Sequence, residues 1–277
     1  MVESPRPVLS IWAHYDDDLI FGCPTIDTAL AAGAPVTTLF LTASDAGRDA
    51  DYVHGRAHGL RLAYEFMHGS ALTWRERSTT LDGGAMATVW EAASAPLTLM
   101  TLGLPDGRPN GTGFDATGNA SLRQLLEGSR DEIDPIGGGT ALTATSLTEA
   151  ISDVMIGMLR AHPDTRLLTH APRIGGPLTE RDHSDHWSTG AFVRRAIESG
   201  AAAFAGVSWR IGYPSAMLPA TLAGAVLARK VDVFRAYAAH DPVVARPDAA
   251  ATLELRGFGD WLQREYELVD GVAVAVR

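Results

Sequence analysis

The N-terminal part of the chain alternates between two kinds of hydrophobic pattern, and this alternation constrains the fold more than any other feature. Pro7 to Ala13 and Pro35 to Thr42 are short apolar runs, the second rich in β-branched residues, and both are typical of buried strands. Leu19 to Ala32 and Arg56 to Met67 place their apolar residues at helical spacing. The order strand, helix, strand, helix predicts a parallel α/β sheet with right-handed crossovers.

The rest of the chain continues this pattern around an irregular middle. A strand is expected over Leu97–Leu102, and a glycine-rich loop follows over residues 103–118. Further on we expect helices at Leu147–Ala161, His186–Ala203 and Ala225–Ala238, and strands at Arg166–Thr169 and Val207–Tyr213. No internal repeat or linker divides the chain, so residues 1–277 are expected to form a single α/β domain. The predicted fold class is a Rossmann-like, mostly parallel sheet flanked by helices, with a long glycine-rich insertion.

Composition excludes several classes of protein. The 277-residue chain has 23 basic and 33 acidic side chains, a formal net charge of −10, which disfavours nucleic acid as a partner because such proteins need a basic surface. Cys23 is the only cysteine, so no intrachain disulfide can staple a small secreted scaffold. We find neither a signal-peptide pattern nor a transmembrane stretch, and we therefore expect a cytoplasmic protein. The oligomeric state is left open.

Two polar clusters follow predicted strands. His14-Tyr15-Asp16-Asp17-Asp18 comes directly after the first strand, and Arg181-Asp182-His183-Ser184-Asp185-His186-Trp187 follows the strand at Arg166–Thr169. Because ligands of open parallel sheets bind outside the carboxyl ends of the strands, both clusters are expected at one site. Two histidines and a carboxylate with one open position are a catalytic zinc arrangement. Taken alone, the first cluster has an alternative interpretation as the acidic first turn of a helix.

The two clusters carry a resemblance to a known family. Ala13-His14-Tyr15-Asp16-Asp17-Asp18 resembles the A-H-P-D-D-[DE] signature of the PIG-L/LmbE-like zinc-dependent N-acetylglucosaminyl deacetylases. His183-Ser184-Asp185-His186 is similar to the H-x-D-H element of that family, and Leu41–Gly47 and Leu104–Gly107 match further segments of bacterial members. The resemblance runs from about Pro7 to Trp187 and is closest to members with a D-D-D-L motif, which include the glycopeptide-antibiotic sugar deacetylases.

The resemblance implies a metal site and a base. His14, Asp17 and His186 would hold one Zn²⁺ per chain, which would polarise the amide carbonyl and activate water. Asp16, beside the ligand Asp17, would accept the proton as that water attacks.

The same resemblance assigns further residues to catalysis and substrate binding. His183 would stabilise the oxyanion or protonate the leaving amine, and Asp185 would set the tautomer of His183 or orient the zinc-binding His186. Arg56 and Asp106 match positions at which family members hold substrate hydroxyls. The alternatives are a helix-surface arginine and an ordinary turn residue.

Two departures from the family pattern affect the pocket. Tyr15 stands where the family usually has proline, so a phenol is expected to enter or border the pocket. Arg56 is followed by Ala57, whereas the family usually has an acidic residue after this arginine, and the role of that carboxylate is in doubt here. Asp45, at the end of the second strand, is expected either to line the pocket or to cap the next turn.

The sequence therefore predicts a metal-dependent amidohydrolase that removes the N-acetyl group from an N-acetylglucosaminyl moiety, on a glycopeptide antibiotic or a related secondary metabolite. The alternatives are a deacetylase of a small amino-sugar conjugate, such as a mycothiol-type precursor, and a non-catalytic sugar- or antibiotic-binding module on the same fold. A nucleotide-binding enzyme and a serine hydrolase are disfavoured, because the chain contains no G-x-G-x-x-G after the first strand, no P-loop and no G-x-S-x-G elbow.

Other conspicuous side chains are interpreted as structural. This group consists of six histidines: His54, His58, His68, His162, His170 and His240. Trp74, Trp90 and Met86 are expected in the core, with an apolar wall for a lipid or aromatic aglycone as the alternative.

Overall fold

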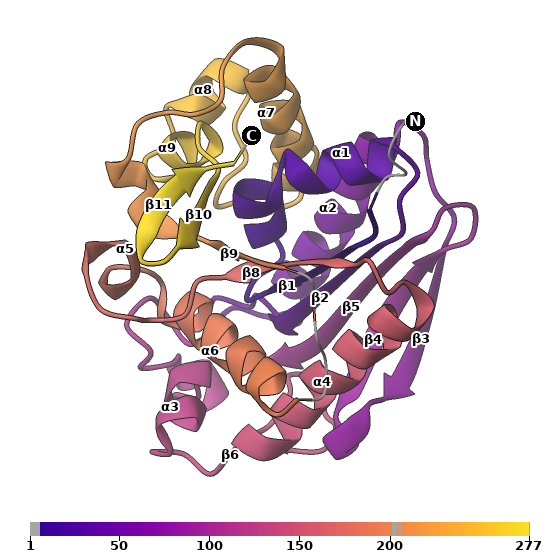
Figure 1. Cartoon of the computed structure of the whole chain (residues 1–277), viewed down its shortest axis with the longest axis vertical. Coiled ribbons are helices and arrows are strands. Elements are labelled where there is room, and N and C mark those ends of the chain that lie inside the picture. The colour runs from indigo at the N-terminus through magenta and orange to yellow at the C-terminus, as the bar shows by residue number, and fades with distance from the viewer. Residues whose placement is uncertain (1–5, 201–203, 205, 277) are drawn as a thin grey trace.

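The computed structural model describes residues 6–200, 204 and 206–276, and its centre is a mixed sheet. Within these residues nine strands lie in the order β11-β10-β9-β8-β1-β2-β5-β4-β3 (Figure 1). The inner strands are parallel: β1 (Val8–Trp12), β2 (Val36–Thr42), β5 (Leu97–Leu104), β8 (Arg166–His170) and β9 (Val207–Arg210). Antiparallel strands extend both edges: β3 (Trp74–Thr80), β4 (Met86–Ala92), β10 (Tyr266–Val269) and β11 (Val272–Ala275). The predicted fold class is confirmed.

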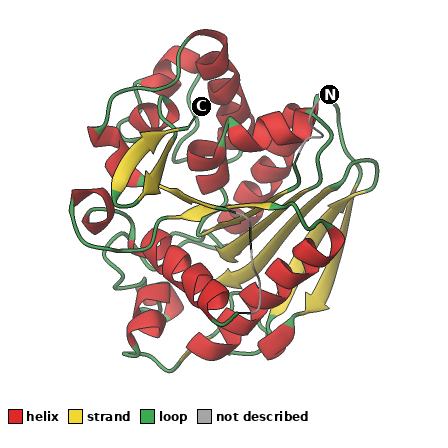
Figure 2. Ribbon diagram, in the orientation of Figure 1, coloured by secondary structure: helices red, strands yellow, loops and turns green. Residues whose placement is uncertain are grey.

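Helices cover both faces of the sheet (Figures 1 and 2). One face packs against α1 (Thr25–Ala31), α2 (Ala50–His68), α7 (Gly224–Ala238), α8 (Ala249–Leu253) and α9 (Phe258–Leu262). The other face packs against α3 (Leu122–Glu127), α4 (Ala144–Ala161) and α6 (Ser184–Glu198). The short α5 (Pro177–Glu180) and the two-stranded β6 (Glu132–Ile133) and β7 (Leu142–Thr143) lie in connections.

The side chains of β1 point alternately to the two faces of the sheet, and helices cover both faces. Val8 and Trp12 belong to the core under α2 and α7, whereas Leu9 and Ile11 belong to the core under α4 and α6. Successive side chains of a strand point to opposite faces, so a strand that is apolar at nearly every position is stable only between two layers of helices.

Two predicted helices differ from the structure, and one hairpin was not predicted. The helix expected at Leu19–Ala32 is divided into a π-helical segment at Asp18–Gly22 and α1, because Pro24 lacks the amide hydrogen that a continuous helix needs. The helix expected at His186–Ala203 begins at Ser184 and ends at Glu198, and residues 201–203 lie outside the described residues. The β3–β4 hairpin was not predicted, because its outward side chains are polar and hide the strand pattern.

The glycine-rich insertion is an ordered loop between β5 and α3. The ring of Phe114 rests on Gly47, where a Cβ atom would lie 2.3 Å from the Cδ1 atom of Phe114, so the loop packs closely on the end of β2. The amide of Ser184 donates to the carbonyl of Pro109 at 3.0 Å, which joins the same loop to the start of α6. The insertion therefore borders the carboxyl edge of the sheet, where both polar clusters lie.

Candidate metal centre and active site

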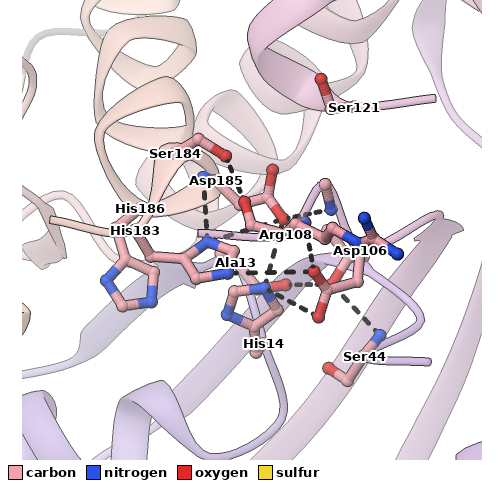
Figure 3. A network of polar contacts seen from close by, with 12 residues as sticks. Ala13, His14, Ser44, Asp106, Arg108, Ser121, His183, Ser184, Asp185 and His186 are labelled. Atoms are coloured by element: carbon pink, nitrogen blue, oxygen red, sulfur yellow. Dashed lines mark hydrogen bonds and ion pairs between the residues drawn. The ribbon is translucent and has the colours of Figure 1, made fainter. Parts of the chain in front are cut away.

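The two polar clusters meet at the carboxyl ends of β1 and β8. Figure 3 shows His14 of the first cluster beside His183 and Asp185 of the second. Ligand atoms of His14, His183 and His186 lie within 4.8 Å of one another, and so do those of Asp17, His170 and His186. His14 follows β1, His170 ends β8, and α6 carries His186 in its first turn. The predicted meeting of the two clusters is borne out by this geometry.

Asp17 lies at the centre of the histidines. Its Oδ1 atom is 3.0 Å from Nε2 of His186, and its Oδ2 atom is 3.2 Å from Nδ1 of His14 and 3.0 Å from Nε2 of His170. Burial alone would raise the pKa of Asp17, but His186, His170 and His14 together hold that pKa well below its usual value. The carboxylate of Asp17 thus lies where it can bind the same metal ion as His14 and His186.

The surroundings of His186 fit a metal ligand. Its Nδ1 atom is 2.8 Å from Oδ1 of Asp182, while its Nε2 atom is buried and has no hydrogen-bond partner among the described residues. A histidine that ligates a metal through one ring nitrogen usually gives the other to a carboxylate, and Asp182 supplies that group. Two imidazoles and a carboxylate are a donor set suited to Zn²⁺. The imidazoles and carboxylates gathered here therefore fit a zinc ion as a donor set.

Asp16 contacts an arginine, whereas Asp17 contacts histidines. Its Oδ1 atom is 2.9 Å from Nη2 of Arg56, and its Oδ2 atom makes no hydrogen bond within the described part of the chain. Burial raises the pKa of Asp16, and the neighbouring Arg56 opposes that shift. A buried carboxylate with one oxygen held and the other free is suited to accept a proton.

The guanidinium of Arg56 forms hydrogen bonds and ion pairs with other groups of the protein. Its Nη1 donates to the carbonyl of Ser44 at 2.7 Å, and its Nε lies 2.5 Å from the hydroxyl of Tyr237 and 3.3 Å from Oδ2 of Asp241. Only 6% of the Arg56 surface is exposed. The family resemblance implies that Arg56 binds the substrate, whereas in the structure its guanidinium contacts Asp16 and other protein groups.

His183 has a defined tautomer. It caps α6, because its Nδ1 accepts a hydrogen bond from the amide of Asp185 at 3.2 Å, and the ring hydrogen of a neutral imidazole must then be on Nε2. Burial, followed by the nearby His14 and His186, lowers the pKa of His183 well below its usual value. The neutral ring is therefore a donor through Nε2, which lies 3.9 Å from Oδ1 of Asp106.

Asp185 acts differently from either predicted role. Its Oδ2 accepts from the amide of Gly107 at 2.7 Å and lies 3.3 Å from Nε2 of His14. The backbone amide of Asp185, not its carboxylate, sets the tautomer of His183, and Asp182 orients His186. The Asp185 carboxylate instead joins the glycine-rich insertion to His14.

The remaining nominated residues hold the surrounding loops. Asp45 accepts from the amides of Asp106 at 2.7 Å and Gly47 at 2.9 Å, which is the turn-capping alternative. Asp106 accepts from the amide of Arg108 at 2.8 Å, and its Oδ2 is 3.6 Å from Nε2 of His14, so it lies in the cluster. The hydroxyl of Tyr15 donates to Thr101 at 3.3 Å, and burial raises the pKa of Tyr15 to about 12.

Four residues of the site were not nominated from the sequence. His170 was interpreted as structural, yet its ring stacks on His186 at 4.0 Å between ring centroids, and burial followed by His186 lowers its pKa to about 4. A neutral His170 can donate to Asp17 and fix that carboxylate. Its position directly after the predicted strand Arg166–Thr169 was the available signal. The other three are Asp182, Tyr237 and Asp241, of which the last two lie far from both clusters in sequence.

Comparisons with known proteins add the following. No family model and no curated protein matches the sequence. Among solved structures, the zinc-inhibited form of teicoplanin deacetylase is 13% identical, with a TM-score of 0.47 over 90% of this chain and 89% of that one. The deacetylase of the antimicrobial A40926 pseudoaglycone is 14% identical, with a TM-score of 0.46 over 91% of this chain and 89% of that one.

Both are deacetylases. They are glycopeptide-antibiotic deacetylases, the group that the sequence motifs resemble. At 13% and 14% identity, with TM-scores of 0.47 and 0.46, this likeness assigns no activity to the present chain. No helix among the described residues is long and apolar enough to cross a membrane.

Proposed function

We propose that this chain is a zinc-dependent amidohydrolase that removes the N-acetyl group from an N-acetylglucosaminyl moiety. The observation that carries the proposal is the cluster of buried His186, Asp17 and His14, in which Nε2 of His186 lies 3.0 Å from Oδ1 of Asp17 without forming a regular hydrogen bond, together with the free carboxylate oxygen of the adjacent residue Asp16. Three ligands, a separate base and a hydrogen-bond donor are the groups that metal-assisted amide hydrolysis requires.

His14, Asp17 and His186 would hold one Zn²⁺ per chain. When bound, the ion supplies a Lewis acid that polarises the amide carbonyl and lowers the pKa of water. The carboxylate of Asp182 and the imidazole of His170 keep these ligands in place, because each hydrogen-bonds a ligand atom.

Asp16 accepts the proton of the attacking water at its free Oδ2. The water oxygen bonds to the carbonyl carbon, and the bond from that carbon to nitrogen then breaks. Asp16 returns the proton to the leaving nitrogen, so that the products are acetate and a free amino sugar. Arg56 holds Oδ1 and keeps Oδ2 facing the substrate.

His183 donates from Nε2 to the oxygen on which negative charge develops. Its neutral state is maintained by burial, and its orientation is set by the α6 cap. A donor whose position is fixed before the reaction stabilises an oxyanion without reorganisation.

We propose a glycopeptide as the substrate within this reaction class. The D-D-D-L motif and the L-T-A-x-D-A-G segment support this choice, and so does the long insertion, which borders the site through Gly107 and Pro109. A glycosylated heptapeptide is therefore expected to be a better substrate than a simple N-acetylglucosaminide or a small conjugate.

Acetate release tests the function. We expect the zinc-loaded protein to release acetate from N-acetylglucosaminyl compounds, and a chelator to abolish this activity. Tight binding of the compounds without release would instead favour a binding module.

The variant Asp16→Asn tests the assignment of the base. It should lower kcat by about 10²–10⁴-fold, since general-base catalysis contributes that much, while zinc content measured by elemental analysis is unchanged. His14→Ala is the matched variant and should lose both zinc and activity. Loss of zinc in Asp16→Asn would reassign Asp16 as a ligand.

A further inference from the structure

A second cavity lies beside the candidate site at the same edge of the sheet. It has a volume of about 660 Å³, which is large enough for a small organic group. Tyr15, Ala43 and Gly103 line it, and they lie at or just after the ends of the adjacent strands β1, β2 and β5. Tyr15 thus lines the cavity, and its neighbours in the chain, His14 and Asp16, belong to the catalytic cluster.

Aromatic rings form the wall of this cavity. Tyr15 and Trp90 line it and meet edge to face, with ring centroids 6.5 Å apart. The indole nitrogen of Trp90 donates to Oε2 of Glu76 at 2.8 Å, which fixes the plane of the ring. Glu76, Ser78, Thr88 and Trp90 face the cavity together, because Glu76 pairs with Trp90 and Ser78 with Thr88 across the β3–β4 hairpin. The wall offers a rigid surface on which a planar ring can stack.

Arg61 supplies a cation that lies over an aromatic ring. Its guanidinium carbon lies 5.0 Å from the centroid of the Trp90 ring, and it forms no hydrogen bond or ion pair with any residue that the structure describes. The nearby carboxylates of Glu65 and Glu76 are engaged by the indole nitrogens of Trp74 and Trp90. Burial lowers the pKa of Arg61, and the charge of Glu76 offsets only part of this. An anion bound in the cavity would offset the rest of the cost of burying the Arg61 charge.

We propose that this cavity binds a carboxylate-bearing aromatic ring of the substrate, in the aglycone next to the acetylated sugar. This inference rests on the proposed function for its link to the reaction. Arginine pairs with a carboxylate through two parallel hydrogen bonds, and it can do so while its plane stacks on an aromatic ring. His58 and His54, one and two turns before Arg61 on α2, line the same cavity and add no negative charge to it, whereas Glu76 contributes a carboxylate whose Oε2 accepts from Trp90.

Two matched substrates test the inference. The probes are 4-carboxyphenyl N-acetyl-β-glucosaminide and its methyl ester, which differ only in the aglycone charge. The wild-type protein should hydrolyse the acid with the lower KM. Arg61→Gln should raise the KM for the acid by about tenfold, since a charge-assisted pair is lost, and leave the ester unchanged. Arg75→Gln, on exposed β3 outside the cavity, is the control and should change neither.

A binding measurement separates this inference from the proposed function. Titration of 4-hydroxybenzoate, followed by tryptophan fluorescence, needs no catalysis. Binding should be seen with the wild-type protein, should be lost in Arg61→Gln, and should also be lost in Ser78→Trp, which fills the cavity from exposed β3. Binding without hydrolysis of either probe would leave the cavity assignment intact and refute the hydrolase. Equal kinetics for acid and ester, with no binding of hydroxybenzoate, would overturn the cavity assignment alone.

Discussion

Two arginines on α2 have opposite surroundings although they are five positions apart. Arg56 is buried and engaged by Asp16, Ser44, Tyr237 and Asp241, whereas Arg61 is partly exposed and unpaired among the described residues. Neither fact follows from the residue type. An arginine held entirely by the protein positions other groups, and one without a hydrogen-bonded partner is available to a ligand.

At the residue scale, Arg56 is predicted to position the base. Arg56→Lys keeps the charge but loses the planar fork, so kcat should fall by about 10- to 100-fold with little change in KM, because a small displacement of a reacting group has this cost. Asp241→Asn should cause a smaller loss of the same kind, and zinc content should not change. Guanidinium added to Arg56→Ala should restore part of the activity.

The kinetic pattern distinguishes the two roles of Arg56. A raised KM at unchanged kcat would show that Arg56 contacts the substrate, as the family resemblance implies. Arg160→Lys makes the same exchange on the exposed side of α4 and is the control, which should change neither kcat nor KM.

At the element scale, the packing of α2 against α7 brings Arg56 to Tyr237 and Asp241. The helices approach closely at Gly59, where a Cβ atom would lie 2.5 Å from the carbonyl oxygen of Tyr237. A side chain at this position must push the helices apart, and with them the groups that hold Asp16.

Gly59→Ala should therefore lower the free energy of unfolding by about 1–3 kcal/mol through overpacking, measured by chemical denaturation. Gly157→Ala is the matched control within α4, because its Cβ would meet nothing within 4 Å. That variant should be unchanged or more stable by up to about 1 kcal/mol. Equal stability of Gly59→Ala and the wild type would contradict the close contact.

At the scale of the whole molecule, buried charges join the C-terminal segment to the sheet. Arg210 of β9 pairs with Glu265 at 2.8 Å, and Nζ of Lys230 in α7 donates to the carbonyl of Arg264 at 2.8 Å. Lys230 is 1% exposed, and burial lowers its pKa from 10.5 to about 8. Folding transfers Lys230 from water into the protein interior, and there the side chain loses its proton at a lower pH than in the unfolded chain.

Stability should depend on pH through Lys230. Between about pH 8 and 10.5 the unfolded chain keeps the lysine proton while the folded protein releases it, so this residue's contribution to stability rises with pH. The unfolding free energy of the wild type minus that of Lys230→Met should increase by about 1–2 kcal/mol from pH 7 to 9.5. The difference isolates Lys230 from the tyrosines, and a value independent of pH would show that the lysine titrates normally.

Much of the architecture was predictable because it depends on local patterns. Continuous apolar runs identified β1 and β2, and helical spacing identified α2, α4 and α7. The β3–β4 hairpin was missed because β3 is polar at every position after Trp74 and so lacks the hydrophobic alternation on which strand prediction depends.

The sequence alone was sufficient to predict the fold class and to place His14, Asp16, Asp17, His183 and His186 at one site, because motifs at strand ends must meet at one edge of a parallel sheet. Only the tertiary structure decided which carboxylate orients His186, that His170 joins the cluster, and that Arg56 holds Asp16 with the help of Tyr237 and Asp241. Hydrogen-bond partners are chosen within a few ångströms in space. Sequence spacing does not carry that information when a partner comes from a helix nearly two hundred residues away.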